Sequence, residues 1–380
     1  MTASPYTLWR DPDAPDWRGT AIEGWHYTSP ARMVEEREAI FARTWQLVGR
    51  LDQLREAGDY LTCGVAGESV LVVHAGSEGL RAFYNVCRHR GRELLEPWTC
   101  GRLRQVQCRY HGWVYGLDGR VRAVPDEAAF PDDLQVGALA LEPVQVDVWH
   151  GFVFVKLEPG GESLREHFDG LDDCLLHAFE PAVLVAAKTF ELDANWKTAI
   201  EAFIETNHVA NLHPRVSKGL RFDETAVAHF RRHSLTVLPT KLAHDWTTRR
   251  GQHWRTWIND STTSEIHYSI FPNVTVHLFA SGLTFLFRYL PDPTNPERTR
   301  LESWTWKRLQ EGETPPPPMS MPDAMGEVFQ QDYENIPRVQ RGVRSRSFRG
   351  PRLNIVESRI GHFHAVVDAC LRARAHQRSS

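Results

Sequence analysis

The stretches CRHRG (87–91) and CRYHGW (108–113) decide how this 380-residue sequence is interpreted. Each stretch holds one cysteine and one histidine, Cys87 with His89 and Cys108 with His111. Both pairs follow strand-like runs, so we expect each pair at a hairpin tip, where two loops converge on one cofactor. Thiolates and imidazoles are metal ligands, and the sequence therefore predicts a metal centre in its first half.

The order of these ligands favours an iron–sulfur cluster over zinc. Zinc fingers usually carry two cysteines followed by two histidines, whereas here each loop supplies one of each. The pattern suits a Rieske-type [2Fe-2S] cluster, in which one iron binds both cysteines and the other binds both histidines. Because neutral imidazoles replace two thiolates, the reduction potential rises from about −400 mV to between about −150 and +300 mV. A zinc ribbon is the alternative.

The rest of the composition is that of an ordinary globular protein. Lys and Arg number 44 against 48 Asp and Glu, and both signs are dispersed along the chain, which argues against nucleic acid or anionic membranes as partners. No apolar run approaches the ~20 residues that cross a bilayer, and no secretion signal is recognised, so we expect a cytoplasmic protein. Four of the six cysteines have no ligand spacing and are interpreted as ordinary side chains: Cys63, Cys100, Cys174 and Cys370.

The pattern of apolar and turn-forming residues divides the chain into two predicted domains. Residues 45–158 contain short alternating or apolar runs separated by turn formers, which predicts an all-β domain with a tight hairpin turn at Asp118-Gly119. Residues 1–44 and 159–380 form the second domain, which mixes helices with an antiparallel meander, so the fold class is α+β. Helices are expected over 30–45, 163–179, from 196 onward, 322–338 and 358–375, and strands over 188–193, 266–271, 274–280, 283–290 and 300–309. The proline run 315–318 is expected to be an extended connector.

A second group of candidate ligands lies in NWKTAIEAFIETNHVANLHP (195–214). With Asn195 as its N-cap, a continuous helix here would place Glu201, Glu205 and His208 on one face. His213 would point about 140° away from that face. Pro214 disfavours helix at the preceding residue, so we expect the helix to end by His213 and both imidazoles to share a metal.

Two histidines and one carboxylate form the facial triad of non-haem Fe(II) oxygenases, which leaves positions open for O2. The carboxylate is expected from the helix at 322–338, which offers Asp323, Glu327, Asp332 and Glu334. Asp323 and Asp332 are about half a turn out of phase, so only one of them faces the site. Asp332 is the preferred ligand and Asp323 the alternative.

With both constellations in this order, the sequence resembles the catalytic α subunits of Rieske non-haem iron oxygenases, the ring-hydroxylating dioxygenase family. The resemblance runs from CRHRG (87–91) through NWKTAIE (195–201) to GHFHAVV (361–367) and supports Asp332 in QDYEN (331–335) as a ligand. It implies a catalytic domain of the helix-grip, START-like kind. Glu205, where many relatives have Asp, would link the His111 of a neighbouring subunit to His208, which implies a homotrimer.

The resemblance also implies a multicomponent enzyme that uses O2 on a small organic substrate. The chain has no dinucleotide-binding fingerprint, so electrons are expected from a separate NAD(P)H-dependent flavin reductase, directly or through a ferredoxin. Mono- or dihydroxylation of a small aromatic or apolar compound is the leading expectation, with O- or N-demethylation or quaternary-amine oxygenation as alternatives. Candidate pocket residues are Phe271, His277, Phe279, Phe285 and Phe287, although aromatic residues on strands more often belong to a plain core. An electron-transfer protein without oxygenase activity and a zinc-binding scaffold are the competing functions.

Overall fold

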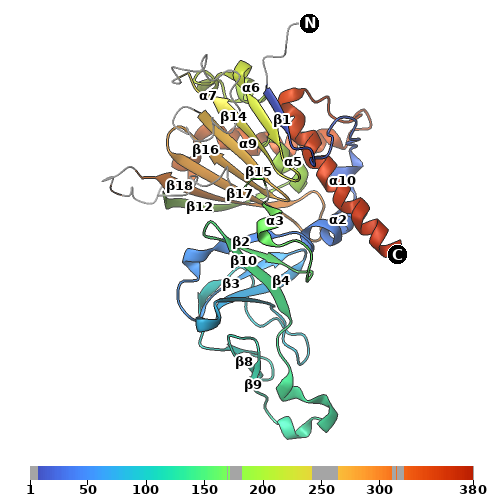
Figure 1. The fold of residues 1–380 in the computed structure, drawn as a ribbon, viewed down its shortest axis with the longest axis vertical. Helices are drawn as coiled ribbons and strands as arrows, with labels where there is room; N and C mark the ends of the chain where they lie inside the picture. Colours follow the sequence, from blue (N-terminus) through green and yellow to red (C-terminus); the bar gives the residue numbers. More distant parts are fainter. Residues whose placement is uncertain are drawn as a thin grey trace. The chain divides into compact units, whose positions relative to one another are not determined.

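The computed structural model describes residues 7–168, 170–171, 182–241, 264–309, 314 and 321–379. It separates into two compact units, Arg37–Phe168 and the combination of Met1–Glu36 with Asp169–Ser380. Figure 1 labels several of the elements in each unit. The proline run 315–318 and most of the helix predicted over 163–179 lie outside the described residues.

The unit Arg37–Phe168 is built from two antiparallel sheets. The larger has the strand order β2-β11-β10-β5-β4-β3-β6, and the smaller has the order β7-β8-β9. The strands are β2 Gln46–Arg50, β3 Asp59–Val65, β4 Glu68–His74, β5 Leu80–Tyr84, β6 Cys100–Arg102, β7 Val106–Gln107, β8 Val114–Tyr115, β9 Val121–Ala123, β10 Pro143–Trp149 and β11 Phe152–Lys156. A π-helical turn, Arg37–Phe41, precedes β2, and the short helix α3 (Leu164–His167) follows β11.

Alternating side chains give this unit two hydrophobic cores. Val70 and Val72 of β4 point into one core, and Leu71 and Val73 point into the other, because successive residues of a strand face opposite sides. The hairpin predicted at Asp118-Gly119 is confirmed, since β8 and β9 pair antiparallel around Gly119. The second core contains Cys87 and Cys108, so the packing of the sheet positions the predicted ligand loops.

The second unit contains an eight-stranded sheet with the order β1-β13-β14-β15-β16-β17-β18-β12. The strands are β1 Thr7–Arg10, β12 Ala182–Leu192, β13 Ala226–His229, β14 Ser234–Pro239, β15 Ser264–Ile270, β16 Val274–Leu278, β17 Leu283–Pro291 and β18 Thr299–Arg308. Strands β13 to β18 pair antiparallel in chain order, which confirms the predicted meander. The sequence reasoning missed β1, β13 and β14.

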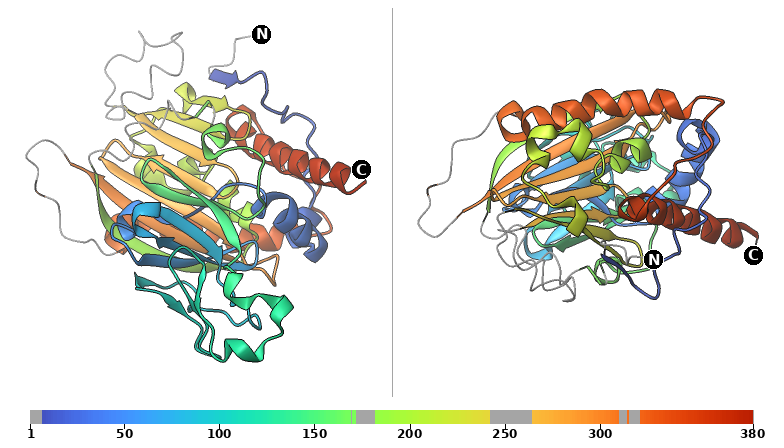
Figure 2. Two further views of the ribbon diagram at one scale, coloured as in Figure 1. Left: turned by 60° about the horizontal axis from the view of Figure 1, so that its bottom comes forward. Right: turned by 90° about the horizontal axis from the view of Figure 1, so that it is seen from above.

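This unit also contains the helices α1 Trp25–Thr28, α2 Pro30–Glu36, α5 Trp196–Glu201, α6 Val209–Leu212, α7 Pro214–Ser217, α9 Met321–Val343 and α10 Ser358–Ser379. Of these, α9 contacts β12, α5 contacts β17 and α10 contacts β13. In the right view of Figure 2, α9 lies along one face of the sheet. The α+β class and the helices predicted over 322–338 and 358–375 are confirmed. The helix predicted over 30–45 stops earlier, because residues 37–41 form a π-helical turn and β2 starts at Gln46.

A buried ionic network holds α5 in place. Lys197 Nζ lies 2.6 and 2.7 Å from the two carboxylate oxygens of Glu36, to which Trp196 Nε1 donates at 2.8 Å. Arg32 adds a second cation to Glu36 at 3.2 Å. Because each buried charge has a close opposite charge, burial is compatible with ionisation here, and the first turn of α5 is fixed to α2.

A second buried polar group joins α10 to β13. The His229 and His362 rings stack with centroids 4.6 Å apart, and His229 Nε2 hydrogen-bonds Ser358 Oγ at 3.1 Å. Arg359 donates to Ser234 and Thr236. Burial lowers the pKa of His229 to about 2 and that of His362 to about 4, and the neighbouring Arg359 acts in the same direction. Both imidazoles are therefore neutral in the folded protein at pH 7.

Across the described ranges, no helix combines the length and the hydrophobicity that are needed to cross a bilayer.

The two neutral histidines predict a loss of stability in mild acid. Below about pH 6.5 an unfolded histidine binds a proton that buried His229 and His362 do not accept, so the free energy of unfolding falls as the pH falls from about 6.5 toward 4. The slope is up to about 1.4 kcal/mol per pH unit for each residue. Urea unfolding between pH 7 and 5 measures it, and His362→Asn should show a shallower slope than the wild type. Equal slopes in the two proteins would contradict this assignment.

Candidate metal centres

The two cysteine–histidine loops have the same backbone construction. The N–H of Cys87 donates to the carbonyl of Arg92 and the N–H of Cys108 to that of Trp113, both at 2.8 Å. In each loop the glycine four residues after the cysteine, Gly91 or Gly112, donates back to the cysteine carbonyl at 3.0 Å. Both glycines have φ of 75°, a left-handed conformation that side chains disfavour. The glycines of the two motifs are thus needed to turn the ligand loops.

These loops place the cysteines inside and the histidines nearer to solvent. Cys87 and Cys108 are each 2% exposed, whereas His89 and His111 are half-buried with ring centroids 4.6 Å apart. Trp113 stacks on His89 with an interplanar angle of 3°. Four donors from two loops therefore face one region, with the sulfurs on the protein side.

Hydrogen-bond donors surround the two sulfurs. The Tyr115 hydroxyl lies 3.2 Å from Cys87 Sγ and accepts the N–H of Arg88 at 3.0 Å. Burial raises the pKa of Tyr115, so its hydroxyl stays protonated and donates to the sulfur. Although burial opposes a thiolate at Cys108, the backbone N–H groups of Tyr110 and His111 lower its pKa below the ordinary value. The surroundings thus favour the thiolate at Cys108, whereas burial raises the pKa of the Cys87 thiol and the hydrogen bond from Tyr115 only partly opposes this.

A single zinc ion fits these four donors poorly. A tetrahedral zinc with bonds of about 2.0–2.3 Å brings all of its ligand atoms within about 4 Å of one another. Within the described ranges, His208, His213 and Asp332 are the one group of three or more metal-binding side chains whose ligand atoms all lie within 4.8 Å. The described donors of the two loops do not form such a group, which fits a cofactor with two metal atoms better than a single ion.

The segment that carries the other candidate ligands is not the continuous helix expected from the sequence. Asn195 caps α5 by accepting the N–H of Lys197 at 2.9 Å, as predicted, but α5 ends at Glu201. Glu201 turns toward His364, whose Nε2 lies 2.7 Å from its carboxylate. The prediction that Glu201, Glu205 and His208 share a helix face is therefore wrong.

A tight turn brings Glu205 and His208 together in place of that helix. Glu205 Oε2 accepts the N–H groups of Asn207 and His208, and Glu205 Oε1 is hydrogen-bonded to His208 Nδ1. Burial alone would disfavour an imidazolium, but the Glu205 carboxylate raises the pKa of His208. His213 lies between α6 and α7, with Pro214 at the first position of α7. Its φ of −122° and ψ of 61° are outside the helical region, as the proline predicts.

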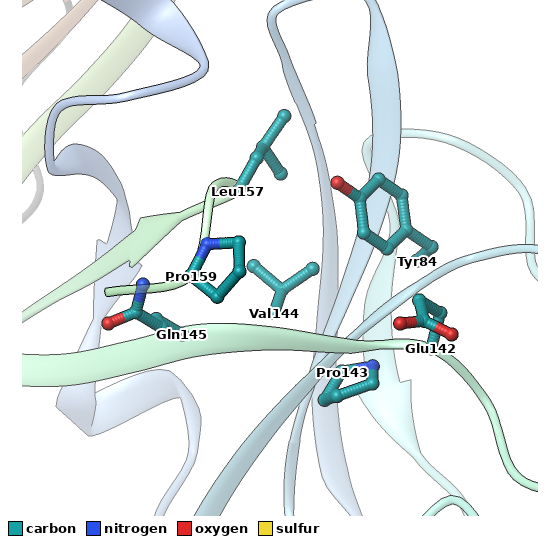
Figure 3. A pocket seen from close by; sticks show the side chains of 7 residues that line it. All are labelled: Tyr84, Glu142, Pro143, Val144, Gln145, Leu157 and Pro159. Atoms are coloured by element: carbon teal, nitrogen blue, oxygen red, sulfur yellow. The ribbon is translucent and has the colours of Figure 1, made fainter. Parts of the chain in front are cut away.

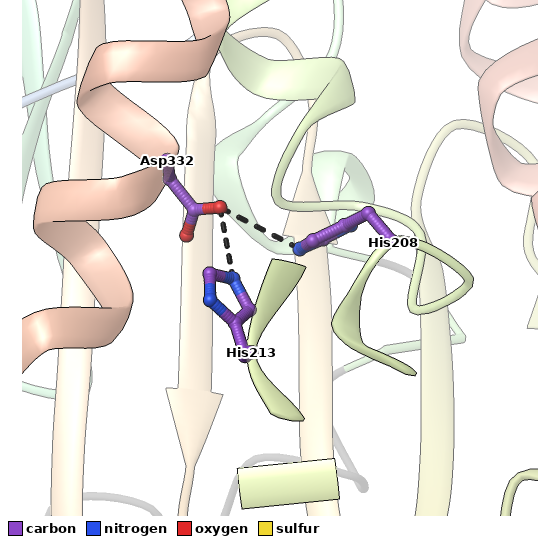
Figure 4. A group of neighbouring side chains, drawn as sticks. All are labelled: His208, His213 and Asp332. Atoms are coloured by element: carbon purple, nitrogen blue, oxygen red, sulfur yellow. Dashed lines mark hydrogen bonds and ion pairs between the residues drawn. The ribbon is translucent and has the colours of Figure 1, made fainter. Parts of the chain in front are cut away.

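Asp332 of α9 completes the group (Figure 4). Its Oδ1 lies 3.0 Å from His213 Nε2 and 3.6 Å from His208 Nε2. His213 and Asp332 are buried, whereas the side chain of His208 is 23% exposed. The side chain of Asp323, the alternative ligand, lies outside the described part of α9, and Glu334 is exposed.

The donor set fits a ferrous ion. Each imidazole uses Nδ1 for a protein partner, Glu205 for His208 and Gln331 Oε1 at 2.8 Å for His213, which directs both Nε2 atoms toward Asp332. Such outer hydrogen bonds orient metal-ligating histidines. Two imidazoles and one carboxylate on one side of an ion leave its other positions open. Sequence reasoning missed Gln331, although its place next to Asp332 is a signal that was available.

A cavity opens beside the three ligands and is mainly apolar. Its lining includes the metal-binding group together with Phe203, Phe279 and Phe329. Of the pocket residues expected from the sequence, His277 and Phe279 line it. Phe285 and Phe287 instead pack in the aromatic core around Phe329. Two polar residues that the sequence did not single out, Glu265 and His267, also line the cavity.

An apolar pocket of about 490 Å³ in the other unit has a different composition (Figure 3). It is lined by Tyr84, Glu142, Pro143, Val144, Gln145, Leu157 and Pro159. Its one carboxylate, Glu142, is paired with Arg88 at 3.2 Å. Nothing in this lining resembles a metal or catalytic group.

Two families of known proteins match separate parts of this chain. The family described as "Ring hydroxylating alpha subunit (catalytic domain)" matches residues 179–373, and the "Rieske [2Fe-2S] domain" matches residues 44–142. The carnitine monooxygenase oxygenase subunit of Escherichia coli (strain K12) is 35% identical over 205 residues, 52% of this chain and 53% of that protein. The alignment thus spans about half the length of that relative.

Longer alignments exist at lower identity. The carnitine monooxygenase oxygenase subunit of Acinetobacter baumannii is 27% identical over 367 residues, which cover 90% of this chain and 92% of that protein. A crystal structure of a quaternary ammonium Rieske monooxygenase in complex with L-carnitine has a TM-score of 0.75 at 23% identity and covers 95% of this chain and 99% of that chain. This likeness shows that the fold is shared.

Removing the carboxylate that completes the His208–His213–Asp332 group should empty one metal site and spare the other. In Asp332→Asn we expect iron to fall by about one atom per chain while the visible absorption of the [2Fe-2S] cluster stays unchanged. Metal analysis together with the absorption spectrum measures both. Glu334→Gln, on the same helix but exposed, is the control and should keep all of its iron. Loss of cluster absorption in Asp332→Asn would contradict the separation of the two sites.

Proposed function

Because the chain belongs to the ring-hydroxylating alpha subunit family and carries a Rieske [2Fe-2S] domain, we propose that it is the oxygenase component of a multicomponent Rieske oxygenase. The observation that carries the proposal is the group of His208, His213 and Asp332, which borders a mainly apolar cavity. An electron-transfer protein would need the cysteine–histidine loops alone. We assign the cluster to Cys87, His89, Cys108 and His111.

The chemistry requires an external reductant. Converting a C–H bond to C–OH with O2 releases the second oxygen atom as water and consumes two electrons and two protons. When bound, the cluster relays single electrons and the ferrous ion supplies open positions for O2. The chain's residues hold the two groups, orient the imidazoles and provide the apolar cavity. We propose that a ferredoxin or flavin reductase supplies the electrons.

Glu205 is proposed to connect the two centres. Its carboxylate is hydrogen-bonded to the His208 ring and to two backbone N–H groups, so its orientation is fixed from its own chain. Its side chain is 12% exposed, which leaves it within reach of a second chain. In a homotrimer, Glu205 would link the partner subunit's His111 to His208. A cytoplasmic location likewise stays a prediction.

A quaternary amine is the substrate class that the comparisons favour over an aromatic hydrocarbon. The two relatives described above are named carnitine monooxygenase subunits, and the similar crystal structure holds L-carnitine. The cavity agrees with this class because aromatic rings and a carboxylate, Glu265, line it together. We therefore propose monooxygenation of an organic cation and keep hydroxylation of a small aromatic compound as the second candidate.

The purified chain should not turn over with NADH alone. Oxygen uptake should appear when a ferredoxin or flavin reductase of a related system is added, because the electrons enter through the cluster. Metal analysis should give about three iron atoms per chain, two in the cluster and one at His208, His213 and Asp332. About two irons would favour the electron carrier, and zinc without visible absorption bands would favour the scaffold.

Glu205→Gln should separate metal binding from turnover. The amide keeps the size of the side chain but weakens the hydrogen bond to His208, so we expect oxygen uptake to fall about 10–100-fold. Iron content and the reduction of the cluster by dithionite should remain normal. Glu224→Gln is the control outside the metal group and should behave as wild type. Wild-type oxygen uptake in Glu205→Gln would refute the proposed link.

A further inference from the structure

The cavity beside His208, His213 and Asp332 has one polar wall, formed by β15 and β16. Glu265 and His267 are two residues apart on β15, so their side chains leave the same face of the sheet. His277 of β16 is paired with His267 in register, and the two rings lie 4.6 Å apart. All three residues line the cavity. The strand register thus places a carboxylate and two imidazoles next to the apolar lining.

His277 needs no partner from a ligand. Its Nε2 lies 2.9 Å from Thr275 Oγ1, which in turn lies 3.0 Å from the Tyr289 hydroxyl. Burial holds the pKa of His277 well below its ordinary value, so the ring is neutral. This residue is a satisfied part of the wall.

Glu265 and His267 are not satisfied in the same way. Glu265 is 9% exposed, and its carboxylate has no hydrogen bond to any residue of the described ranges. The Nε2 atom of His267 is 3.7 Å from Glu265 Oε2, beyond hydrogen-bond length. His267 is 8% exposed, and its Nε2 has no hydrogen-bond partner within those ranges. A buried ring nitrogen without a hydrogen-bond partner is unfavourable until a ligand supplies one, and the Glu265 carboxylate lies beside it on the same wall.

The neighbouring aromatic rings indicate which kind of ligand would interact with Glu265 and His267. Phe279 lies 5.8 Å from the His267 ring, and Phe203 lies 5.9 Å from the His277 ring. Phe329 stacks against Phe203 and lines the same cavity. Ring faces attract an organic cation, and a carboxylate does so over a longer distance. No lysine or arginine is among the described residues of this lining.

We propose that Glu265 is the residue that selects a positively charged substrate in this cavity, and that His267 Nε2 binds a polar group of the same molecule. The proposal deepens the function proposed above and rests on it. The expected ligand is an organic cation, such as a trimethylammonium compound, with no negative group close to its charge. It also carries a hydroxyl or a similar polar group within a few bonds of the charge. Glu265 and His267 are binding residues in this scheme, since the metal-binding group lies elsewhere on the lining.

Equilibrium binding tests Glu265 without requiring turnover. Choline and 3,3-dimethylbutan-1-ol have the same shape, but only choline is charged. Calorimetric titration of the iron-loaded protein should show tighter binding of choline, and Glu265→Gln should reduce that preference by about tenfold or more. Glu265→Asp, which keeps the charge, should retain the preference. Glu334→Gln is the exposed control on α9 and should match the wild type.

Either of two binding results would contradict the proposal. If wild type binds the two compounds equally, or if Glu265→Gln keeps the full preference for choline, then Glu265 does not select charge. Iron content and cluster absorption of each variant show that it is folded, so a change in preference is not a loss of structure.

His267 is tested with a second pair of compounds. Propyltrimethylammonium replaces the hydroxyl of choline by a methyl group and keeps the charge. Wild type should prefer choline, and His267→Phe should lose this preference while still favouring choline over 3,3-dimethylbutan-1-ol. An equal preference in wild type and His267→Phe would remove His267 from the proposal.

The binding experiments test the selection by Glu265, and the oxygen-uptake experiment tests the oxygenase function, so the two proposals can be contradicted independently. A charge preference without oxygen uptake in the presence of a reductase would leave the selection by Glu265 intact and reject the oxygenase function. Oxygen uptake on neutral substrates without a charge preference would do the reverse.

Discussion

The contact between Asp332 and the two imidazoles is the constraint on which the catalytic unit depends. Asp332 is 119 residues away from His213 in sequence, yet its Oδ1 lies 3.0 Å from His213 Nε2. The helix that carries Asp332, α9, lies along the eight-stranded sheet, and the turn that carries His208 follows α5, which the Glu36–Lys197 pair anchors. The sheet thus acts as the common base for ligands from two distant segments. A shift of either segment would separate the donors.

The two metal centres are built on different principles. At Cys87 and Cys108 the backbone of two short hairpin loops sets the ligand positions, through equal hydrogen bonds and a left-handed glycine in each loop. At His208 and His213 the backbone is irregular, and side chains of Glu205 and Gln331 fix the ring orientations. The first kind of site is determined by a local sequence motif. The second exists only after the helices have packed.

The elements that position His208, His213 and Asp332 also line the cavity. Phe203 follows α5, Phe329 lies on α9 one turn before Asp332, and β15 and β16 supply the polar wall. The proposed substrate-binding residues and the proposed metal ligands therefore share one scaffold but lie on different elements of it. Such a separation of tasks is consistent with a family that hosts several chemistries on one fold.

The sequence alone predicted the ligand loops, the α+β class, the antiparallel meander and the candidate pair His208 and His213, because short-range spacing and strand periodicity carry that information. Asp332 was preferred over Asp323 with the help of the family resemblance. The sequence also predicted the break at His213, since Pro214 acts on its direct neighbour. Only the tertiary structure decided that α5 stops at Glu201 and that Glu205 reaches His208 through a turn. Helical spacing predicted instead that Glu201, Glu205 and His208 share one helix face. This prediction failed because long-range packing overrides local helix propensity. The pairing of β15 with β16, and with it the place of Glu265 and His267 on the cavity wall, is likewise a register between strands that spacing along the chain does not contain.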